Sequence, residues 1–221
     1  SRDALERIAR ARGAPFAPDS LTEDYELGLS LGAMGGRGAF VRLPSGPGRP
    51  AVATRALFPG DRKAAINQKA RWMTGIALSG WDRLGWGGGL AERWMRMRDR
   101  QSVLAAVVLA AAYFALLLWV GLVFLELLGG RELAPFSPVF AYLVTANLAL
   151  LFWRLGWRYG FVASAYGWRE GLRALPRVVV SNIVAMAAAR QAMFRYLGFG
   201  GRGRPFWDKT AHVFPRHLPA E

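Results

Sequence analysis

Three side chains in one short segment are of the types that bind sugars and phosphates. Gln68, Arg71 and Trp72 are spaced by three and four positions, so they share one face of a helix with 3.6 residues per turn. A guanidinium neutralises phosphate charge, an indole stacks on a sugar ring, and an amide hydrogen-bonds hydroxyl groups. The spacing predicts a helix over residues 61–79 that binds a charged, hydroxyl-rich ligand. The alternative is a membrane-surface helix anchored by its arginine and tryptophan.

A second candidate for chemistry lies upstream, where Thr22 is followed by Glu23 and Asp24. Ser20 and Glu23 match a capping box, which predicts a helix over residues 21–34. Asp24 is a candidate general base, because a helix N-terminus favours negative charge and a base must be ionised to accept a proton. The alternative is that both carboxylates only cap the helix.

The composition favours a membrane protein over a nucleic-acid-binding protein. The 221 residues carry a net charge of +14, 53% of them are hydrophobic, and the mean hydropathy is +0.17. Nucleic-acid binders are basic but hydrophilic, whereas a basic and apolar chain suits anionic lipid headgroups. The chain has no cysteine, which excludes disulfides and thiolate metal sites within it. We therefore expect membrane lipids, and not nucleic acid, as partners.

Two segments are long and apolar enough to cross a bilayer, which takes about 20 residues. Residues 103–128 carry a single charge, Glu126, and residues 138–153 carry none. A third apolar segment, 175–197, is interrupted by two polar residues, and we predict an interfacial or re-entrant helix there. A third crossing stays open as the alternative.

Arginines flank the two predicted spans on their outer sides and predict the orientation. They precede the first span at Arg93, Arg96, Arg98 and Arg100, and follow the second at Arg154, Arg158, Arg169 and Arg173. The loop between the spans holds one arginine, balanced by a glutamate. The pattern predicts a multi-pass protein of the bacterial inner membrane, with both outer flanks in the cytoplasm.

The segment ahead of the spans shows two short stretches typical of strands, residues 39–43 and 51–58. They predict a hairpin at the edge of a sheet whose other strands precede Ser1. We therefore expect three regions: the end of a cytoplasmic domain with an interfacial helix (1–89), a membrane region (90–174), and an interfacial helix with a tail (175–221).

The order of these features resembles membrane-embedded family 2 glycosyltransferases of the cellulose-synthase-like type. Those enzymes carry the acidic triplet seen at residues 22–24, then the pattern of Gln68, Arg71 and Trp72, and then transmembrane helices. Residues 21–29, Phe58-Pro59 and the tail over residues 207–215 are most similar to bacterial inner-membrane proteins of the phage-adsorption protein B type. The resemblance covers essentially the whole chain.

The resemblance implies an α/β fold for residues 1–89, as the C-terminal part of a GT-A glycosyltransferase domain, followed by an α-helical membrane region. It implies that Asp24, beside Glu23, is the catalytic base of an inverting transfer from a nucleotide-diphosphate sugar donor to a glycan acceptor. Gln68, Arg71 and Trp72 would line the acceptor site and the diphosphate. The product would be a cell-surface polysaccharide or another glycan.

The chain departs from the family's pattern in one respect. Family members bind the nucleotide and a divalent metal, Mg²⁺ or Mn²⁺, through upstream aspartates that include an Asp-x-Asp motif, and this sequence has no such motif. The metal is therefore expected only in the full-length protein, and we expect the fragment alone to be inactive. The alternative function is a non-catalytic inner-membrane scaffold or phage-receptor component with an outer-membrane partner.

Overall fold

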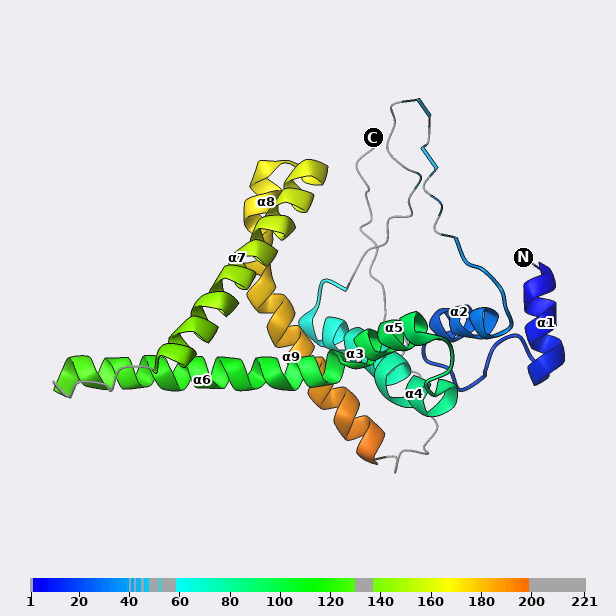
Figure 1. The fold of residues 1–221 in the computed structure, drawn as a ribbon, viewed down its shortest axis with the longest axis horizontal. Helices are drawn as coiled ribbons and strands as arrows, with labels where there is room; N and C mark the ends of the chain where they lie inside the picture. The colour runs from blue at the N-terminus through cyan, green and yellow to red at the C-terminus, as the bar shows by residue number, and fades with distance from the viewer. Residues whose placement is uncertain are drawn as a thin grey trace. The chain divides into compact units, whose positions relative to one another are not determined.

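The computed structural model describes residues 2–39, 41, 43, 44, 46, 47, 52, 59–129 and 137–198. These residues divide into two compact units, one formed by residues 1–105 with 187–221 and the other by residues 106–186. Figure 1 shows the chain coloured along its length, with the helices labelled.

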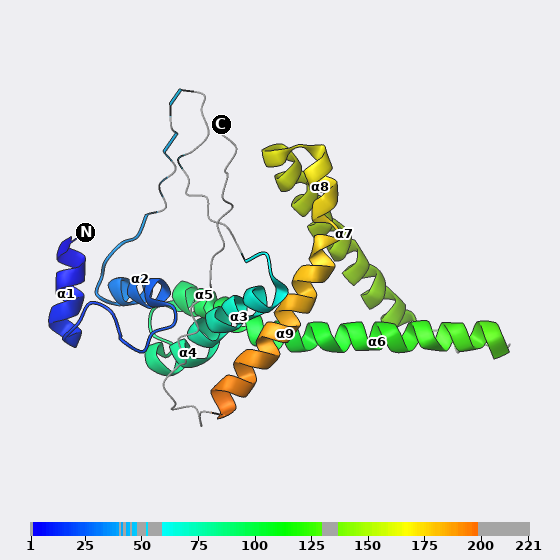
Figure 2. The same ribbon diagram turned by 180° about the vertical axis from the view of Figure 1, so that it is seen from behind.

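The regular elements described in the first unit are all helices, joined by turns and loops. Its α-helices are α1 (Arg2–Arg12), α2 (Glu23–Ala33), α3 (Arg62–Met73), α4 (Ser79–Leu84) and α5 (Leu90–Arg100), and a π-helix, η1 (Thr74–Leu78), joins α3 to α4. The helices α2, α3, α4 and α5 lie together in both opposite views (Figures 1 and 2). Small side chains fill much of the core, which includes Ile8, Ala70, Met73 and Ala77.

The predicted α/β fold is wrong for the described residues, which contain helices and no strand. Most of the two predicted strands, 39–43 and 51–58, lies outside the described residues. Within the described part, one backbone hydrogen bond of 2.8 Å joins the N–H of Val52 to the carbonyl of Leu43. An isolated pair of short strands is marginal in water unless further strands or a helix cover it, and here helix-on-helix packing forms the core.

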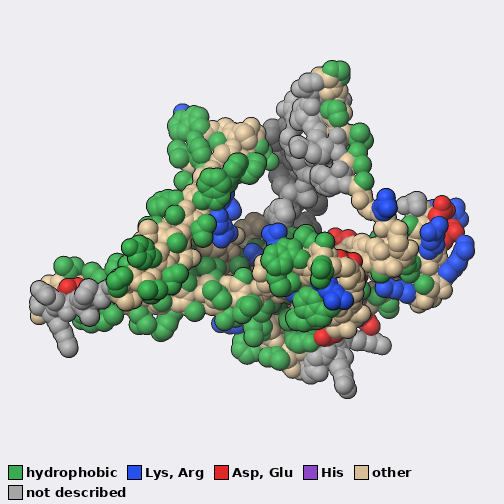
Figure 3. Space-filling view, viewed as in Figure 1, with side chains coloured by type: hydrophobic (Ala, Val, Ile, Leu, Met, Phe, Trp, Pro, Cys, Tyr) green, Lys and Arg blue, Asp and Glu red, His purple; other side chains and the backbone are tan. Residues whose placement is uncertain are grey.

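The second unit contains most of α6 (Ser102–Gly129), all of α7 (Pro138–Tyr166) and α8 (Trp168–Ala174), and the first part of α9 (Arg177–Gly198). Gly167 turns α7 into α8 with φ 92°, a left-handed conformation that favours glycine. The two helices pack closely, since a Cβ on Gly171 would lie 2.9 Å from Tyr159 and Ala163. Hydrophobic side chains cover α6 and α7 on the face shown in Figure 3, whereas charged side chains gather on α1.

Three helical segments are long and apolar enough to cross a membrane by length and composition: α6, α7, and the stretch Trp168–Gly198. The prediction of two spans with an interfacial helix at 175–197 is therefore corrected to three candidate spans. The sequence argument gave too much weight to Ser181 and Asn182. Helix α9 continues unbroken through both, and the Asn182 amide donates a 3.2 Å hydrogen bond to the Tyr113 hydroxyl of α6. A polar side chain satisfied in this way costs little within an apolar helix.

Candidate active site

The acidic triplet forms the start of α2, although the predicted capping box is not formed. Helix α2 begins at Glu23, with Thr22 at the N-cap, and the Thr22 side chain makes no capping hydrogen bond. Glu23 and Asp24 are exposed. Asp24 Oδ1 accepts a 2.8 Å hydrogen bond from the N–H of Tyr25. The candidate base thus stands on the first turn of a helix, with its carboxylate open to solvent.

The predicted motif helix begins as expected at Asp61, whose side chain accepts a 2.8 Å hydrogen bond from the N–H of Ala64. Gln68 and Arg71 are half-buried on α3, and Trp72 is 41% exposed. The three residues therefore retain side-chain surface outside the core. An exposed indole beside an amide and a guanidinium suits contact with a sugar bearing charged groups.

Thr22 and Gly75 bring the two motif segments into contact. A Cβ added to Gly75 would lie 2.7 Å from both Oγ1 and Cγ2 of Thr22, and 3.1 Å from Cβ of Leu21. Gly75 lies one helical turn beyond Arg71 and Trp72, so the start of α2 packs directly behind the motif on α3. Only a residue without a side chain allows so close an approach.

The same turn is a π-helix, an arrangement that is rare and frequently marks functional sites. The Thr74 hydroxyl donates a 2.9 Å hydrogen bond to the Ala70 carbonyl within it. A Cβ on Gly80 would lie 2.1 Å from the Gly75 carbonyl oxygen, so the wide turn also requires glycine at its far end. No pattern in the sequence indicated this π-helix, which contains the Gly75 that contacts Thr22.

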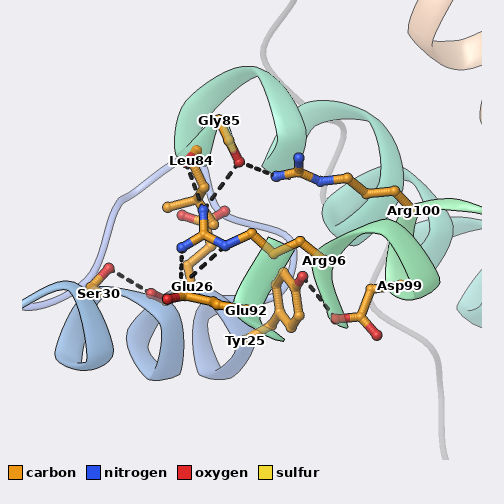
Figure 4. A network of polar contacts seen from close by, with 9 residues as sticks. All are labelled: Tyr25, Glu26, Ser30, Leu84, Gly85, Glu92, Arg96, Asp99 and Arg100. Atoms are coloured by element: carbon orange, nitrogen blue, oxygen red, sulfur yellow. Dashed lines mark hydrogen bonds and ion pairs between the residues drawn. The ribbon is translucent and has the colours of Figure 1, made fainter. Parts of the chain in front are cut away.

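Polar contacts attach α2 to α5, and α5 to the end of α4 (Figure 4), and a further contact attaches α2 to α4. The Tyr25 hydroxyl donates a 3.1 Å hydrogen bond to Asp99 of α5. Burial, together with the Asp99 carboxylate, raises the pKa of Tyr25 to about 12. Glu26 is buried and accepts a 3.1 Å hydrogen bond from Nε of Arg83, with a second from Nη2 of the same arginine. The helix that carries Asp24 is thus fixed in orientation by its neighbours.

Two arginines predicted to lie on the membrane flank are buried instead. Arg96 and Arg100 are 4% and 6% exposed. Arg96 donates to the carbonyls of Leu84 at 2.9 Å and Gly85 at 3.1 Å, and Arg100 donates to the Gly85 carbonyl at 2.5 Å. These carbonyls end α4 and have no partner within that helix. Both arginines therefore cap α4.

Arg100 also lies between two indole rings. Its guanidinium carbon is 4.9 Å from the centre of the Trp81 ring and 4.6 Å from that of Trp86, and the two rings meet edge to face. Such cation–π contacts stabilise a desolvated guanidinium. Burial lowers the pKa of Arg100. The four-residue spacing of Arg96 and Arg100 on one helix face, near a pair of tryptophans, was the available sequence signal for this structural role.

The described residues do not offer a metal site. No group of three or more histidine, aspartate or glutamate side chains converges in this part of the chain. Glu23 and Asp24 are adjacent and exposed, without a third ligand, and a divalent metal requires several oxygen ligands. The expected Mg²⁺ or Mn²⁺ of the full-length protein stays a prediction about residues outside this chain.

The start of α2, which carries Asp24, thus contacts Gly75 one turn beyond Arg71 and Trp72, and apolar helices follow in the chain. Residues 1–155 match the family described as "Glycosyl transferase family group 2". The match covers more than half of the chain, so the chain belongs to this family. Its candidate spans and its relatives make it part of a membrane protein.

The chain is also similar to two curated proteins of Escherichia coli. They are "Bacteriophage adsorption protein B" of strain K12 and "Bacteriophage N4 adsorption protein B" of O157:H7, each 30% identical over 233 aligned residues that cover 94% of this chain. These matches confirm the resemblance to the phage-adsorption protein B type. The chain spans 31% of the length of each relative. No solved structure matches the chain.

Proposed function

We propose that the chain forms the acceptor side of an inverting membrane glycosyltransferase. The observation that supports the proposal is the contact of Thr22 with Gly75 in a chain of this family, because it brings the start of the helix that carries Asp24 next to the end of the helix that carries Gln68, Arg71 and Trp72. The donor is a nucleotide-diphosphate sugar, and the acceptor is a hydroxyl of a growing glycan. The nucleotide and the metal are bound by residues outside this chain.

The reaction follows from the chemistry of these side chains. The Asp24 carboxylate accepts the proton of the acceptor hydroxyl, and the hydroxyl oxygen forms a bond to the anomeric carbon of the donor. The bond between that carbon and the diphosphate breaks, and the nucleoside diphosphate leaves with the electron pair. Arg71 offsets the charge on the diphosphate, Trp72 stacks on the acceptor sugar, and Gln68 hydrogen-bonds its hydroxyls. Glu23 supports the acidic character of the site.

Replacing the base tests this mechanism in the full-length protein. Asp24→Asn keeps the size and the helix start but removes the proton acceptor, so we expect sugar incorporation to fall by at least about 100-fold. Incorporation of radiolabelled sugar into glycan by membranes measures the effect. Asp19→Asn, at an exposed acid in the loop before α2, is the matched control and should leave incorporation unchanged. Wild-type incorporation by Asp24→Asn would remove Asp24 from the mechanism.

A second candidate function is a non-catalytic scaffold or phage-receptor component of the inner membrane. The printed names of the two relatives, which are adsorption proteins, favour it. The Asp24→Asn variant distinguishes the two functions. If the protein acts as a non-catalytic scaffold, the variant should support phage adsorption as well as the wild type does. As a scaffold or receptor component, the protein would bind a partner in the outer membrane.

We place residues 2–100 on the cytoplasmic side of the bacterial inner membrane, where nucleotide-sugars are made, with α6 and α7 crossing the membrane. The end of α9 then lies on the same side as α3, to which it is joined by the hydrogen bond between Gln191 and Asn67. Support comes from the arginines that flank the candidate spans. Fewer arginines are available to face the membrane surface than the sequence suggests, because Arg96 and Arg100 are buried where they cap α4. Arg93 and Arg98 remain exposed ahead of α6, and Arg169 and Arg173 are exposed after α7.

A further inference from the structure

A basic groove lies between α3 and α9, within the first unit. Its volume is about 770 Å³. Four of the nine residues that line it are basic, none is acidic, and Ile66, Ala187 and Phe194 supply apolar surface. The basic residues are Arg62, Lys63, Arg190 and Arg195. The groove therefore concentrates positive charge over an apolar lining.

Hydrogen bonds fix the two walls of the groove relative to each other. The Gln191 amide of α9 donates a 2.7 Å hydrogen bond to the side-chain oxygen of Asn67 in α3. Further along α9, the Tyr196 hydroxyl donates a 2.8 Å hydrogen bond to Asp82 of α4. Within the described part of the chain, Arg62, Lys63 and Arg190 make no ion pair. These hydrogen bonds hold α3 and α9 together, and the three basic side chains remain available to bind an anion.

The groove is lined by other residues of α3 than the candidate acceptor site. Gln68, Arg71 and Trp72 are not among its lining residues. At 100° per residue, Ile66 points about 120–160° away from these three side chains, whereas Asn67 points about 40° from Arg71. The groove therefore uses none of the proposed acceptor-site residues. This inference goes beyond the proposed glycosyl transfer and does not depend on it.

We propose that the groove binds the phosphate-bearing headgroup of an anionic membrane lipid. Arginine forks match phosphate oxygens, and basic residues close to a membrane surface attract anionic lipid. The wall helix α9 belongs to a candidate membrane span, and residues 178–189 ahead of its basic end are apolar except for Ser181 and Asn182.

Exposed apolar side chains next to these cations favour lipid over a soluble phosphate. Phe194 is 71% exposed and Leu197 is 65% exposed, both on the last turns of α9. Water-facing aromatic and aliphatic groups interleaved with arginines are typical of helices at the boundary between headgroups and acyl chains. The headgroup phosphate would bind the arginines while the acyl chains cover Phe194 and Leu197.

Lipid retention by the full-length protein tests the proposal. The protein is reconstituted in vesicles of equimolar phosphatidylglycerol and phosphatidylcholine, extracted in mild detergent, and its bound lipids are counted by mass spectrometry. We expect wild-type protein to retain phosphatidylglycerol in excess. Arg62→Gln with Arg190→Gln should reduce that excess by about 30-fold, because each basic residue near an anionic surface contributes about a factor of five.

Two further variants separate the groove from general charge and from misfolding. Asn67→Asp keeps the oxygen that accepts from Gln191, so it preserves the contact of α3 with α9 while placing a carboxylate in the groove, and the excess should fall again. Arg12→Gln with Arg37→Gln removes the same charge from exposed positions outside the groove and should leave the excess unchanged.

Three results would overturn the proposal. The first is wild-type retention in both groove variants, and the second is an equal loss in the Arg12 and Arg37 control. The third is release of the bound phosphatidylglycerol by millimolar inorganic phosphate or nucleoside diphosphate, which would assign the groove to a soluble anion. Loss in the groove variants with no release by soluble phosphates supports the lipid.

Discussion

At the scale of single residues, the meeting of the two motifs depends on the absence of a side chain at Gly75. The neighbouring Thr22 occupies the space that a Cβ would need, at 2.7 Å from two of its atoms. Real Cβ atoms do not approach so closely, so any larger residue must displace the start of α2. The position of Asp24 relative to Gln68 and Trp72 is therefore sensitive to one methyl group.

Gly75→Ala is expected to destabilise the protein by about 1–3 kcal/mol through overpacking, and to lower sugar incorporation. Removing Oγ1 and Cγ2 with Thr22→Ala should recover part of that loss, so the two substitutions together should cost less than their sum. Thermal unfolding of the detergent-solubilised protein, followed by circular dichroism, measures all three variants.

Gly32→Ala is the matched control for this cycle. It lies on α2, where an added Cβ meets nothing within 4 Å, so the helix should be unaffected or stabilised by up to about 1 kcal/mol. Additive effects of Gly75→Ala and Thr22→Ala would show that the contact does not set the position of α2.

The sequence predicted the residues of the candidate site better than the residues that hold them in place. Gln68, Arg71 and Trp72 share a helix face because their spacing requires it, and Asp24 stands on a first turn as expected. Their roles in catalysis stay predictions. The partners Glu26 and Arg83 are 57 residues apart, and no local pattern relates them. Contacts of this kind depend on tertiary packing, which residue spacing along one helix does not report.

At the scale of elements, α5 packs against α2 and α4 and holds α2 in place. Its buried Arg96 and Arg100 donate hydrogen bonds to the carbonyls at the end of α4, and its Asp99 carboxylate accepts a hydrogen bond from the Tyr25 hydroxyl. The hydrogen bond exists only while Tyr25 keeps its proton, which makes this junction sensitive to alkaline pH.

The stability of the wild-type protein should therefore fall as the pH rises from about 10 to about 12. Below about pH 10 the Tyr25 phenol is protonated in both the folded and the unfolded protein, so its contribution is complete. Its pKa in the folded protein is about 12, so the unfolded state loses the proton first and gains stability over that window. Unfolding midpoints measured at a series of pH values would follow this loss.

Tyr25→Phe should flatten the fall, because phenylalanine has no proton to lose, while lowering stability at neutral pH through the loss of the hydrogen bond. Tyr166→Phe, at an exposed position at the end of α7, should keep the wild-type pH profile. Identical alkaline profiles for Tyr25→Phe and wild type would assign the fall to other groups.

Helices were predictable from sequence where periodicity or apolar length was strong, as in α3 and α6. The α/β assignment failed because it rested on two short stretches and on the resemblance, while the described residues around them form helices. The span predicted over residues 138–153 lies within α7, which is longer than the apolar run because it includes Arg154 and Arg158. The helix continues past both to Tyr166, and Arg158 donates a 3.1 Å hydrogen bond to the Ala174 carbonyl of α8.

At the scale of the whole molecule, the proposed orientation places the loop between α6 and α7 outside the cytoplasm. Ser137→Cys in that loop should react with a membrane-impermeant thiol reagent in intact spheroplasts of a strain expressing the full-length protein with any cysteines outside this chain replaced by serine. Arg12→Cys, on the exposed face of α1, should react only after permeabilisation. Mass shift on a denaturing gel reports the labelling, and the reverse pattern would invert the orientation.

Attachment of α2 to residues far along the chain sets an order of events during synthesis. Tyr25 is separated from Asp99 by 74 residues, and α6 begins at Ser102 directly after. At about 5–20 residues per second, the helix bearing Asp24 waits about 4–15 s on the ribosome for its partner. The partner arrives together with the first candidate span, so this part of the chain is completed only as the nascent chain begins to be delivered to the membrane.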